Sequence, residues 1–160
     1  MEVYRILRAP FDKDPLSVVG SERYPGRWNQ AGQGLLYTAS HPALAFLETM
    51  VHFETVPFNE LPTLRLFVLA VDETRIQQLP LKSLPLGWNT TTDRMVTQRL
   101  LTQWIEQPDD PATNFLGVGV PSALLEMSVN YLFAPKHPLF YTIQVVDSYP
   151  LSIDPRLWRV

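Results

Sequence analysis

Prolines limit the fold of this chain more than any other feature. Fifteen prolines stand against seven glycines among 160 residues, and they recur along the whole chain. Each proline fixes φ and removes a backbone donor, so it ends or kinks a helix and is excluded from central strands. The sequence therefore predicts many short elements joined by fixed turns, rather than long helices.

Five short segments have the composition of strands. The segment at 64–71, LRLFVLAV, is almost entirely apolar, which is typical of a strand covered on both faces. Alternating or short apolar runs predict four more strands, at 3–7, 35–39, 116–120 and 140–146. The run at 3–7 is expected to be an edge or opening strand.

Two segments have helical periodicity. The first is expected at about 41–53, with Ser40 as N-cap and Pro42 in the first turn. The second is expected at about 92–107, with a stripe of five apolar residues facing the core: Val96, Leu100, Leu101, Trp104 and Ile105. Helices and strands do not alternate as in a doubly wound sheet, so we predict one mixed α/β domain spanning residues 1–160.

Composition excludes several classes of function. Hydrophobic residues make up 46% and charged residues 18% of the chain, as in an ordinary globular protein. The net charge is −3 without a Lys/Arg cluster, which argues against direct binding of nucleic acid. There are no cysteines, so disulfides and cysteine-based zinc sites are excluded. With no apolar run of about 18 residues and no signal peptide, we expect no membrane association and a cytoplasmic location.

Glu48 is the first candidate for a functional residue. It lies at the margin of the apolar stripe of the first predicted helix. A half-buried carboxylate needs an arginine, hydrogen-bond donors or a hydroxyl-bearing ligand, because burial without a partner is costly. A solvated helix edge or a plain ion pair is the alternative. His52, one turn later, does not complete a metal site, because no third ligand follows at metalloprotease spacing.

Arg27 lies in a long, turn-rich loop, beside Trp28 and Asn29. A guanidinium offers a planar fork that matches phosphate, and the tryptophan offers a surface for stacking. The alternative is a surface arginine stacked on its own tryptophan. The glycines around 32–34 and 117–119 do not form a GxGxxG fingerprint, so a Rossmann site is not expected.

Ser122 directly follows Pro121 at the end of the predicted strand 116–120. Its hydroxyl has two possible roles, contact with a ligand or capping of a short helix. No GxSxG motif surrounds it, so a serine nucleophile is not expected.

These segments together resemble the RES domain family, which takes its name from an arginine, a glutamate and a serine. The matching motifs are GRWN at 26–29, GLLYTA at 34–39, ALAFLE at 43–48 and VPSA at 120–123. The three naming residues then correspond to Arg27, Glu48 and Ser122. Further matches are YRI at 4–6, HP at 137–138 and DPRL at 154–157. The chain departs from the pattern with Pro25 before Gly26 and with Ala134-Pro135, near Asn130, where the family often has Asn-Pro.

The resemblance implies an α+β fold similar to that of ADP-ribosyltransferases, with a central split sheet and flanking helices. It also implies a toxin of a bacterial type II toxin–antitoxin pair, which consumes NAD by breaking the nicotinamide–ribose bond through hydrolysis or phosphorolysis. The implied partner is an Xre-type helix-turn-helix antitoxin that covers the active site in a hetero-oligomer. No metal is implied.

Within that resemblance, Glu48 is expected to stabilise positive charge at the ribose, and Arg27 to hold the pyrophosphate. Tyr37 is expected on the nicotinamide or its ribose, and Ser122 on the nicotinamide side. The remaining expected contacts to the dinucleotide are Trp28, Asn29 and Arg5.

Two alternatives remain open at the level of the sequence. In the first, ADP-ribose is transferred to a host protein instead of to water or phosphate. This alternative stays open because the glutamate does not determine which acceptor is used. In the second, the chain is a non-catalytic module that binds a nucleotide or an antitoxin.

Overall fold

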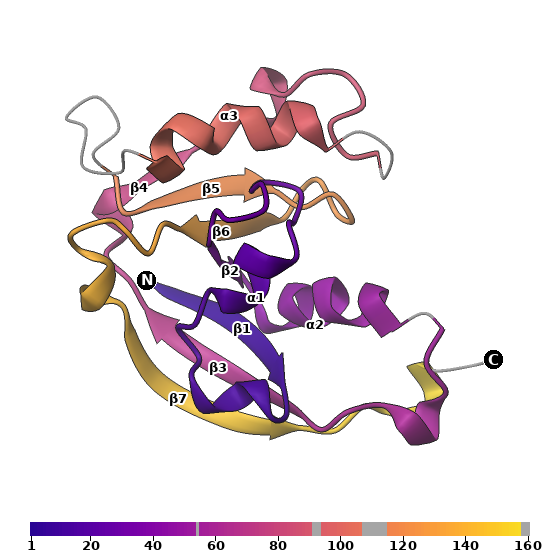
Figure 1. Ribbon diagram of the computed structural model, residues 1–160. Coiled ribbons are helices and arrows are strands. Elements are labelled where there is room, and N and C mark those ends of the chain that lie inside the picture. The colour runs from indigo at the N-terminus through magenta and orange to yellow at the C-terminus, as the bar shows by residue number, and fades with distance from the viewer. Residues whose placement is uncertain (54, 91–93, 107–114, 158–160) are drawn as a thin grey trace.

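The computed structural model describes residues 1–53, 55–90, 94–106 and 115–157. Its centre is one sheet of seven strands in the order β4-β5-β6-β2-β1-β3-β7 (Figure 1). The strands are β1 (Glu2–Arg8), β2 (Leu36–Ala39), β3 (Leu64–Ala70), β4 (Ile76–Gln78), β5 (Gly117–Pro121), β6 (Val129–Phe133) and β7 (Gln144–Leu151). Only β4 and β5 pair in parallel, and every other neighbouring pair is antiparallel.

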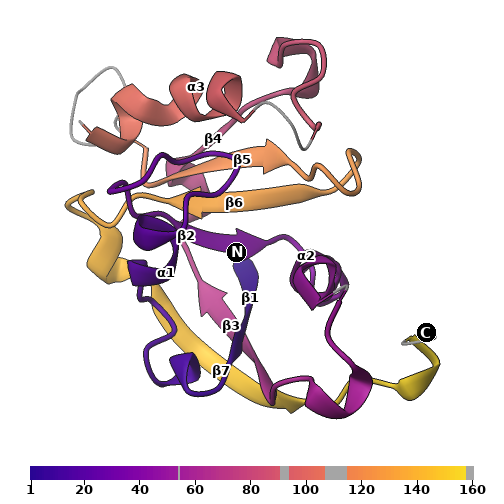
Figure 2. The same ribbon diagram turned by 45° about the vertical axis from the view of Figure 1, so that its right-hand side comes forward.

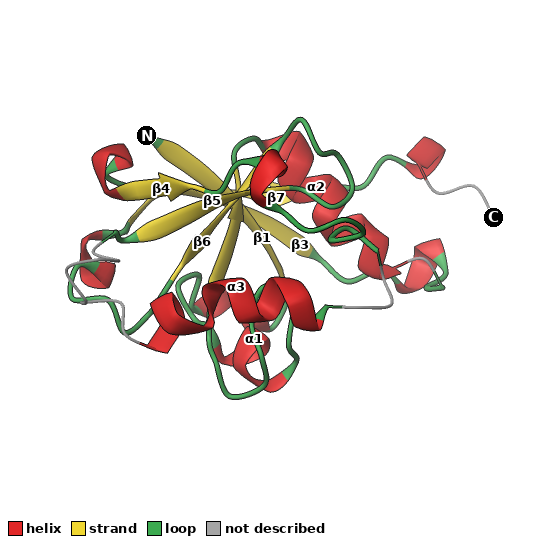
Figure 3. Cartoon of the chain, turned by 90° about the horizontal axis from the view of Figure 1, so that it is seen from above, coloured by secondary structure: helices red, strands yellow, loops and turns green. Residues whose placement is uncertain are grey.

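The sheet is split between β1 and β2. Only Tyr4 and Ala39 are paired there, whereas β1 and β3 are paired along seven residues each. Seen from above, the strands fan out from one another, which is the twist expected of a sheet that curves strongly (Figure 3). The predicted α+β class with a split sheet is therefore confirmed.

Three α-helices accompany the sheet in the described residues: α1 (Val19–Arg23), α2 (Pro42–Met50) and α3 (Met95–Glu106). Short 3₁₀ turns make up most of the remaining helical structure, as the many prolines predict. They lie at Phe11–Lys13, Val51–Phe53, Phe58–Glu60, Glu73–Arg75, Leu81–Ser83, Phe140–Thr142 and Pro155–Leu157. None of the helices in the described ranges is long and apolar enough to cross a membrane.

Helices α2 and α3 cover the same face of the sheet (Figure 2). On β2, Tyr37 packs into the core beneath α3, while Ala39 packs against Leu44 and Ala45 of α2. Residues two apart on a strand point to the same face, so the two helices lie on one side of the sheet. The segment around α1 lies on the other face, where Val18 joins the core.

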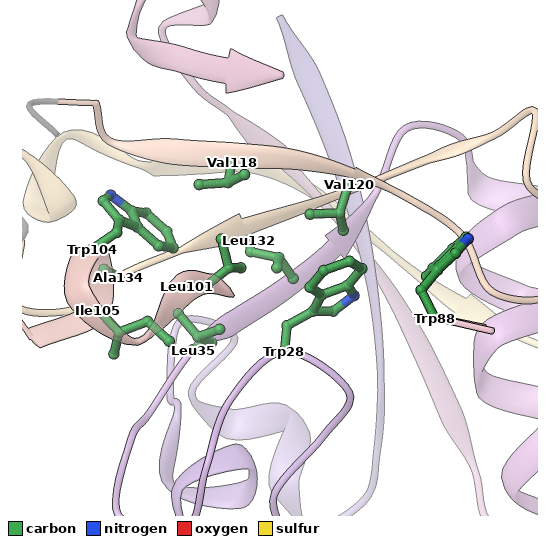
Figure 4. Packing of buried hydrophobic residues seen from close by; sticks show 10 residues of the cluster. All are labelled: Trp28, Leu35, Trp88, Leu101, Trp104, Ile105, Val118, Val120, Leu132 and Ala134. Atoms are coloured by element: carbon green, nitrogen blue, oxygen red, sulfur yellow. The ribbon is translucent and has the colours of Figure 1, made fainter. Parts of the chain in front are cut away.

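The core beneath α3 fills the space between that helix and strands β2, β5 and β6. Figure 4 shows the two tryptophans Trp28 and Trp88 beside each other, with ring centroids 5.9 Å apart. The other buried members of this core are Leu35, Leu101, Trp104, Ile105, Val118, Val120, Leu132 and Ala134. The Arg27 loop is thus tied to α3 through its neighbouring tryptophan.

The predicted buried stripe of α3 is wrong at two positions. Val96 and Leu100 are 41% and 45% exposed, whereas Thr97 is fully buried beside Leu101. The inward position is taken by a polar residue, Thr97, whose hydroxyl donates a hydrogen bond to the Arg27 carbonyl. The predicted ends of this helix at 92 and 107 lie outside the described residues.

The predicted boundaries of other elements also need correction. His41, not Ser40, is the N-cap of α2, because its Nδ1 accepts from the Ala43 amide while Ser40 still bonds to Val129 of β6. β1 is an opening strand, but it lies inside the sheet between β2 and β3. The last strand begins at Gln144, after the 3₁₀ turn at Phe140–Thr142. Strands β4 and β6 were not predicted.

Candidate active site

Glu48 points from the last turn of α2 towards the ends of two strands. One carboxylate oxygen, Oε1, accepts two hydrogen bonds: from Ser122 Oγ at 2.7 Å and from Asn130 Nδ2 at 2.5 Å. Ser122 follows β5 and Asn130 lies on β6, so three elements that are distant in sequence meet at one carboxylate. The sequence prediction that Glu48 must find partners is confirmed, and these partners are uncharged donors.

Ser122 is fully buried, and its hydroxyl serves two purposes. It donates to Glu48 and accepts from the backbone amides of Leu124 and Leu125, each at 3.1 Å. The helix-capping role considered from the sequence is not found, because residues 123–128 form bends and turns and no helix; the hydroxyl holds this turn and also binds Glu48. A direct bond from Ser122 to nicotinamide stays a prediction, and these contacts do not favour it.

Arg27 lies half-buried in the loop before β2. Its Nη1 donates to the carbonyl oxygens of Trp88 at 2.7 Å and Thr90 at 2.8 Å, which fixes one side of the guanidinium fork. Burial lowers the pKa of Arg27, and the charge of Arg94 lowers it further, while Glu48 and Tyr37 oppose that change. Arg94 and Glu48 therefore both lie close enough to Arg27 for their charges to act on its guanidinium.

Helix α3 holds the backbone of the Arg27 loop. Thr97 Oγ1 donates to the Arg27 carbonyl at 2.7 Å, and Gln98 Nε2 donates to the Gly26 carbonyl at 2.9 Å. Both donors come from the first turn of α3. The helix thus fixes the direction in which the Arg27 side chain leaves the loop.

Asn29 holds the same loop from inside. It is fully buried, and its Oδ1 accepts from the Gly26 amide at 3.0 Å and from the Tyr37 hydroxyl at 2.7 Å. Its Nδ2 donates to three carbonyl oxygens, those of Ser21, Gln30 and Gln33. The polar atoms of Asn29 already hold the loop, which does not favour a direct contact with a ligand. That contact stays a prediction.

Tyr37 stands beneath the loop on β2. Its hydroxyl also accepts from the Trp28 amide at 3.3 Å, and burial raises the pKa of this tyrosine. Gly26 is needed here, since a Cβ at that position would lie 2.6 Å from the Tyr37 hydroxyl. The motif GRWN is therefore a loop that closes tightly on the tyrosine.

Trp28 and Arg5 lie deeper in the structure than a ligand contact suggests. The Trp28 side chain is only 3% exposed and belongs to the core beneath α3. Arg5 shares the face of β1 that carries Val3, away from α2, and donates to the carbonyl oxygens of Pro15 and Ser17. Burial lowers the pKa of Arg5 to about 10. Ligand contacts by Trp28 and Arg5 stay predictions that these positions do not favour.

Three residues of the site are missed by sequence reasoning. Thr97 escapes notice because it interrupts an apolar stripe, and Asn130 is noted only as an asparagine near Ala134-Pro135, where the chain departs from the family pattern. Arg94 just precedes α3 and is exposed, but its charge reaches Arg27 and Tyr37. A polar residue inside a buried stripe is the available signal for Thr97.

The arrangement provides an anionic centre and a cationic loop on one face of a split sheet. Glu48 is oriented by neutral donors, and Arg27 and Arg94 supply positive charge. The described residues contain no group of three or more His, Asp or Glu side chains that could hold a metal ion. Such an arrangement has the charges to attract a ligand that combines phosphate with a group drawn to a carboxylate.

Comparison with known proteins assigns the family. The model of the RES domain matches residues 2–154, and this chain belongs to the RES domain family. A protein named Toxin Res from Yersinia enterocolitica is 32% identical over 158 residues, which cover 98% of this chain and 99% of that protein. Another Toxin Res, from Pseudomonas putida, is 35% identical over 139 residues, covering 86% of this chain and 90% of that protein.

Two further proteins are similar to this chain, one in sequence and one in fold. The Prs ADP-ribosylating toxin of Sphingobium sp. is 31% identical over 157 residues, which cover 93% of this chain and 90% of that protein. A chain in the crystal structure of the Mycobacterium tuberculosis MbcT–MbcA toxin–antitoxin complex has the same fold, with a TM-score of 0.75 and 19% identity. That match covers 98% of this chain and 85% of the other.

Proposed function

We propose that this protein is the toxin of a type II toxin–antitoxin pair and that it cleaves the bond between nicotinamide and ribose in NAD. The observation that carries the proposal is that Glu48 and the Arg27 loop lie on one face of the sheet, with the charge of Glu48 acting on Arg27. NAD combines a pyrophosphate with a ribose whose carbon C1′ becomes positive as the bond breaks. One anionic and one cationic group at a fixed separation suit both parts of this substrate.

The reaction breaks the bond between C1′ and the pyridinium nitrogen. The electron pair of that bond leaves with the nitrogen and neutralises nicotinamide, and C1′ gains oxocarbenium character. The Glu48 carboxylate stabilises this charge, as carboxylates do in glycoside cleavage. Water or phosphate then forms the new C–O bond at C1′, and water releases its extra proton to the carboxylate or to solvent. Nicotinamide is already a good leaving group, so the reaction needs no strong acid.

Arg27 is proposed to bind the pyrophosphate, with Arg94 as a second positive charge. Charge-assisted bonds from a guanidinium to phosphate fix orientation as well as position. Since Trp88 and Thr90 hold Nη1, the guanidinium is preorganised before the substrate arrives. The Arg27 loop is held by Tyr37, Asn29 and Thr97. These residues are proposed to affect substrate binding through the position of Arg27.

The acceptor of ADP-ribose has two proposed identities, water or phosphate, and a protein is the alternative acceptor. The similarity to a Sphingobium toxin named as ADP-ribosylating supports transfer to a protein, with hydrolysis and phosphorolysis as the other outcomes. Incubation of the purified chain with NAD, in buffer with and without inorganic phosphate, separates them. Free ADP-ribose indicates hydrolysis, and ADP-ribose 1″-phosphate indicates phosphorolysis. If nicotinamide appears only when bacterial protein is added, and that protein gains the mass of ADP-ribose, transfer is the reaction.

Binding without chemistry is the remaining alternative. It would give tight NAD binding without release of nicotinamide under any of these conditions, and that result would contradict the proposal. Arg27→Ala is expected to raise the KM for NAD at least 10-fold, about the value of one charged hydrogen bond. Arg23→Ala, at an exposed arginine of α1, is the matched control and is expected to leave KM unchanged.

An antitoxin partner of the Xre helix-turn-helix class is proposed to cover the site in the cytoplasm. Three apolar side chains next to Ser122 support a protein partner, because Leu124, Leu125 and Met127 are 43%, 49% and 91% exposed. The shared fold with a chain of the MbcT–MbcA toxin–antitoxin complex also supports an antitoxin. Co-expression with an antitoxin of this class that binds the chain should suppress nicotinamide release, and retained activity in a purified complex would refute coverage of the site.

A further inference from the structure

Asn130 lies on β6 with its side chain on the face covered by α2 and α3. It shares that face with Leu132, a member of the core beneath α3. Its backbone pairs with Ala39 on one side and Val120 on the other, so the strand position is fixed from both neighbours. Its Nδ2 donates a hydrogen bond to Glu48 Oε1.

The orientation of the Asn130 amide follows from its partner. An ionised carboxylate only accepts hydrogen bonds, so the NH₂ group must face Glu48 and the carbonyl oxygen must face away. That oxygen, Oδ1, is buried and has no hydrogen-bond partner among the described residues. A buried acceptor without a donor destabilises a fold by about the desolvation cost of the group.

Asn130 is therefore a poor choice for stability at this position. Asparagine is disfavoured in strands, and a β-branched residue would remove the unpartnered oxygen and suit β6 better. The stability of the strand therefore does not explain an asparagine at this position. Within the described residues, what the side chain provides is the hydrogen bond that it donates to Glu48.

We propose that Asn130 is a positioning residue for Glu48, which rests on the proposed function. Asn130 and Ser122 both bind the same carboxylate oxygen, Oε1. Together they fix the plane of the carboxylate and leave Oε2 as the oxygen that faces C1′ of the ribose. Asn130 acts through Glu48 and does not touch the substrate, because its own oxygen is enclosed.

The test compares two substitutions on adjacent, paired strands. Asn130→Val removes the donor to Glu48 together with the unpartnered oxygen. Thr38→Val is the control, because Thr38 is buried on the other face of β2 and its hydroxyl donates to the Tyr131 carbonyl at 3.0 Å. We expect Asn130→Val to lower kcat about 10- to 100-fold, with little change in KM and with a melting temperature equal to or above that of the wild type. We expect Thr38→Val to lower the melting temperature by about 2–4 °C and to keep kcat.

Two results would overturn the proposal. One is an unchanged kcat in Asn130→Val, and the other is a loss of kcat that accompanies a melting temperature below that of Thr38→Val. A crystal structure of Asn130→Val tests the same point without activity. The Glu48 carboxylate should rotate away from its present orientation, and an unmoved carboxylate would contradict the positioning role. If the wild type released no nicotinamide, the proposed function would fail, while this structural comparison would still decide the role of Asn130.

Discussion

Replacing Thr97 by valine tests whether α3 holds the Arg27 loop. Valine has nearly the shape of threonine but no hydroxyl, so the change removes the 2.7 Å hydrogen bond to the Arg27 carbonyl. The same hydroxyl also donates to the Arg94 carbonyl at 3.0 Å, but that carbonyl keeps the Gln98 amide as a partner. Only the Arg27 carbonyl loses a donor supplied by this helix.

The magnitude follows from the burial of Thr97, which is fully buried. A carbonyl left without its donor costs about 1–2 kcal/mol. For a chain of 160 residues this corresponds to a fall of about 3–6 °C in the melting temperature. Because the guanidinium then leaves its fixed position, about 1 kcal/mol of substrate binding is lost, and the KM for NAD should rise about 5-fold.

Thr102→Val is the matched control on the same helix. Thr102 is half-buried. Its hydroxyl donates to the Gln98 carbonyl within α3 and accepts a 3.3 Å hydrogen bond from the exposed Gln30 side chain, so its removal leaves the backbone of the Arg27 loop held by Thr97 and Gln98. Its removal should change the free energy of unfolding by less than about 0.5 kcal/mol and leave KM unchanged. Thermal unfolding by circular dichroism and steady-state kinetics of nicotinamide release measure both quantities. If Thr97→Val matched Thr102→Val in both, the idea that α3 positions Arg27 would be refuted.

Three further predictions separate structural roles from ligand contacts. Arg5→Ala should lower the free energy of unfolding by about 2–3 kcal/mol, because two carbonyl oxygens lose a charged donor. Thermal unfolding measures this change. An unchanged melting temperature with a raised KM for NAD would instead support the expected contact of Arg5 with phosphate. Burial raises the pKa of Tyr37 above its ordinary 10.0, so its folded form keeps a proton that the unfolded form loses, and stability should fall as the pH rises above that value. Tyr37→Phe should weaken this fall in urea titrations, and an identical pH dependence in both proteins would contradict the burial of the hydroxyl. His41→Ala should lower the free energy of unfolding by about 0.5–1 kcal/mol, because it removes the N-cap of α2. Ser40→Ala should lower it by less in the same urea titrations. The reverse order would contradict the assignment of His41 as the cap.

Part of the fold was predictable because some segments have only one reasonable environment. The run at 64–71 forms β3 in the sheet interior, since eight nearly continuous apolar residues need cover on both faces. The strand β6 was missed because VNYLF mixes an asparagine and a tyrosine with apolar residues over only five positions. Short strands of this kind are defined by their neighbours, here β2 and β5, and local sequence does not contain that information.

The candidate site shows the same limit. The sequence identified Arg27 and Glu48 through their motifs, and the structure brings them to one face. Trp28 and Asn29 were expected to contact the ligand because their side chains can stack and hydrogen-bond. In the structure those capacities are used inside the loop, and only the three-dimensional contacts reveal this. Asn130 could not be assigned because its partner, Glu48, is 82 residues away in sequence.

The most direct test of the role of Glu48 is the release of nicotinamide from NAD by the wild type and by Glu48→Gln, followed by chromatography. Glu60→Gln is the matched control, because Glu60 is exposed in the 3₁₀ turn Phe58–Glu60. We predict that the wild type and Glu60→Gln release nicotinamide at similar rates. In Glu48→Gln the rate should fall at least 100-fold, the order expected when a charge-stabilising group is removed. The melting temperature of Glu48→Gln should equal that of the wild type. Release by Glu48→Gln at the wild-type rate would contradict the central role of this carboxylate.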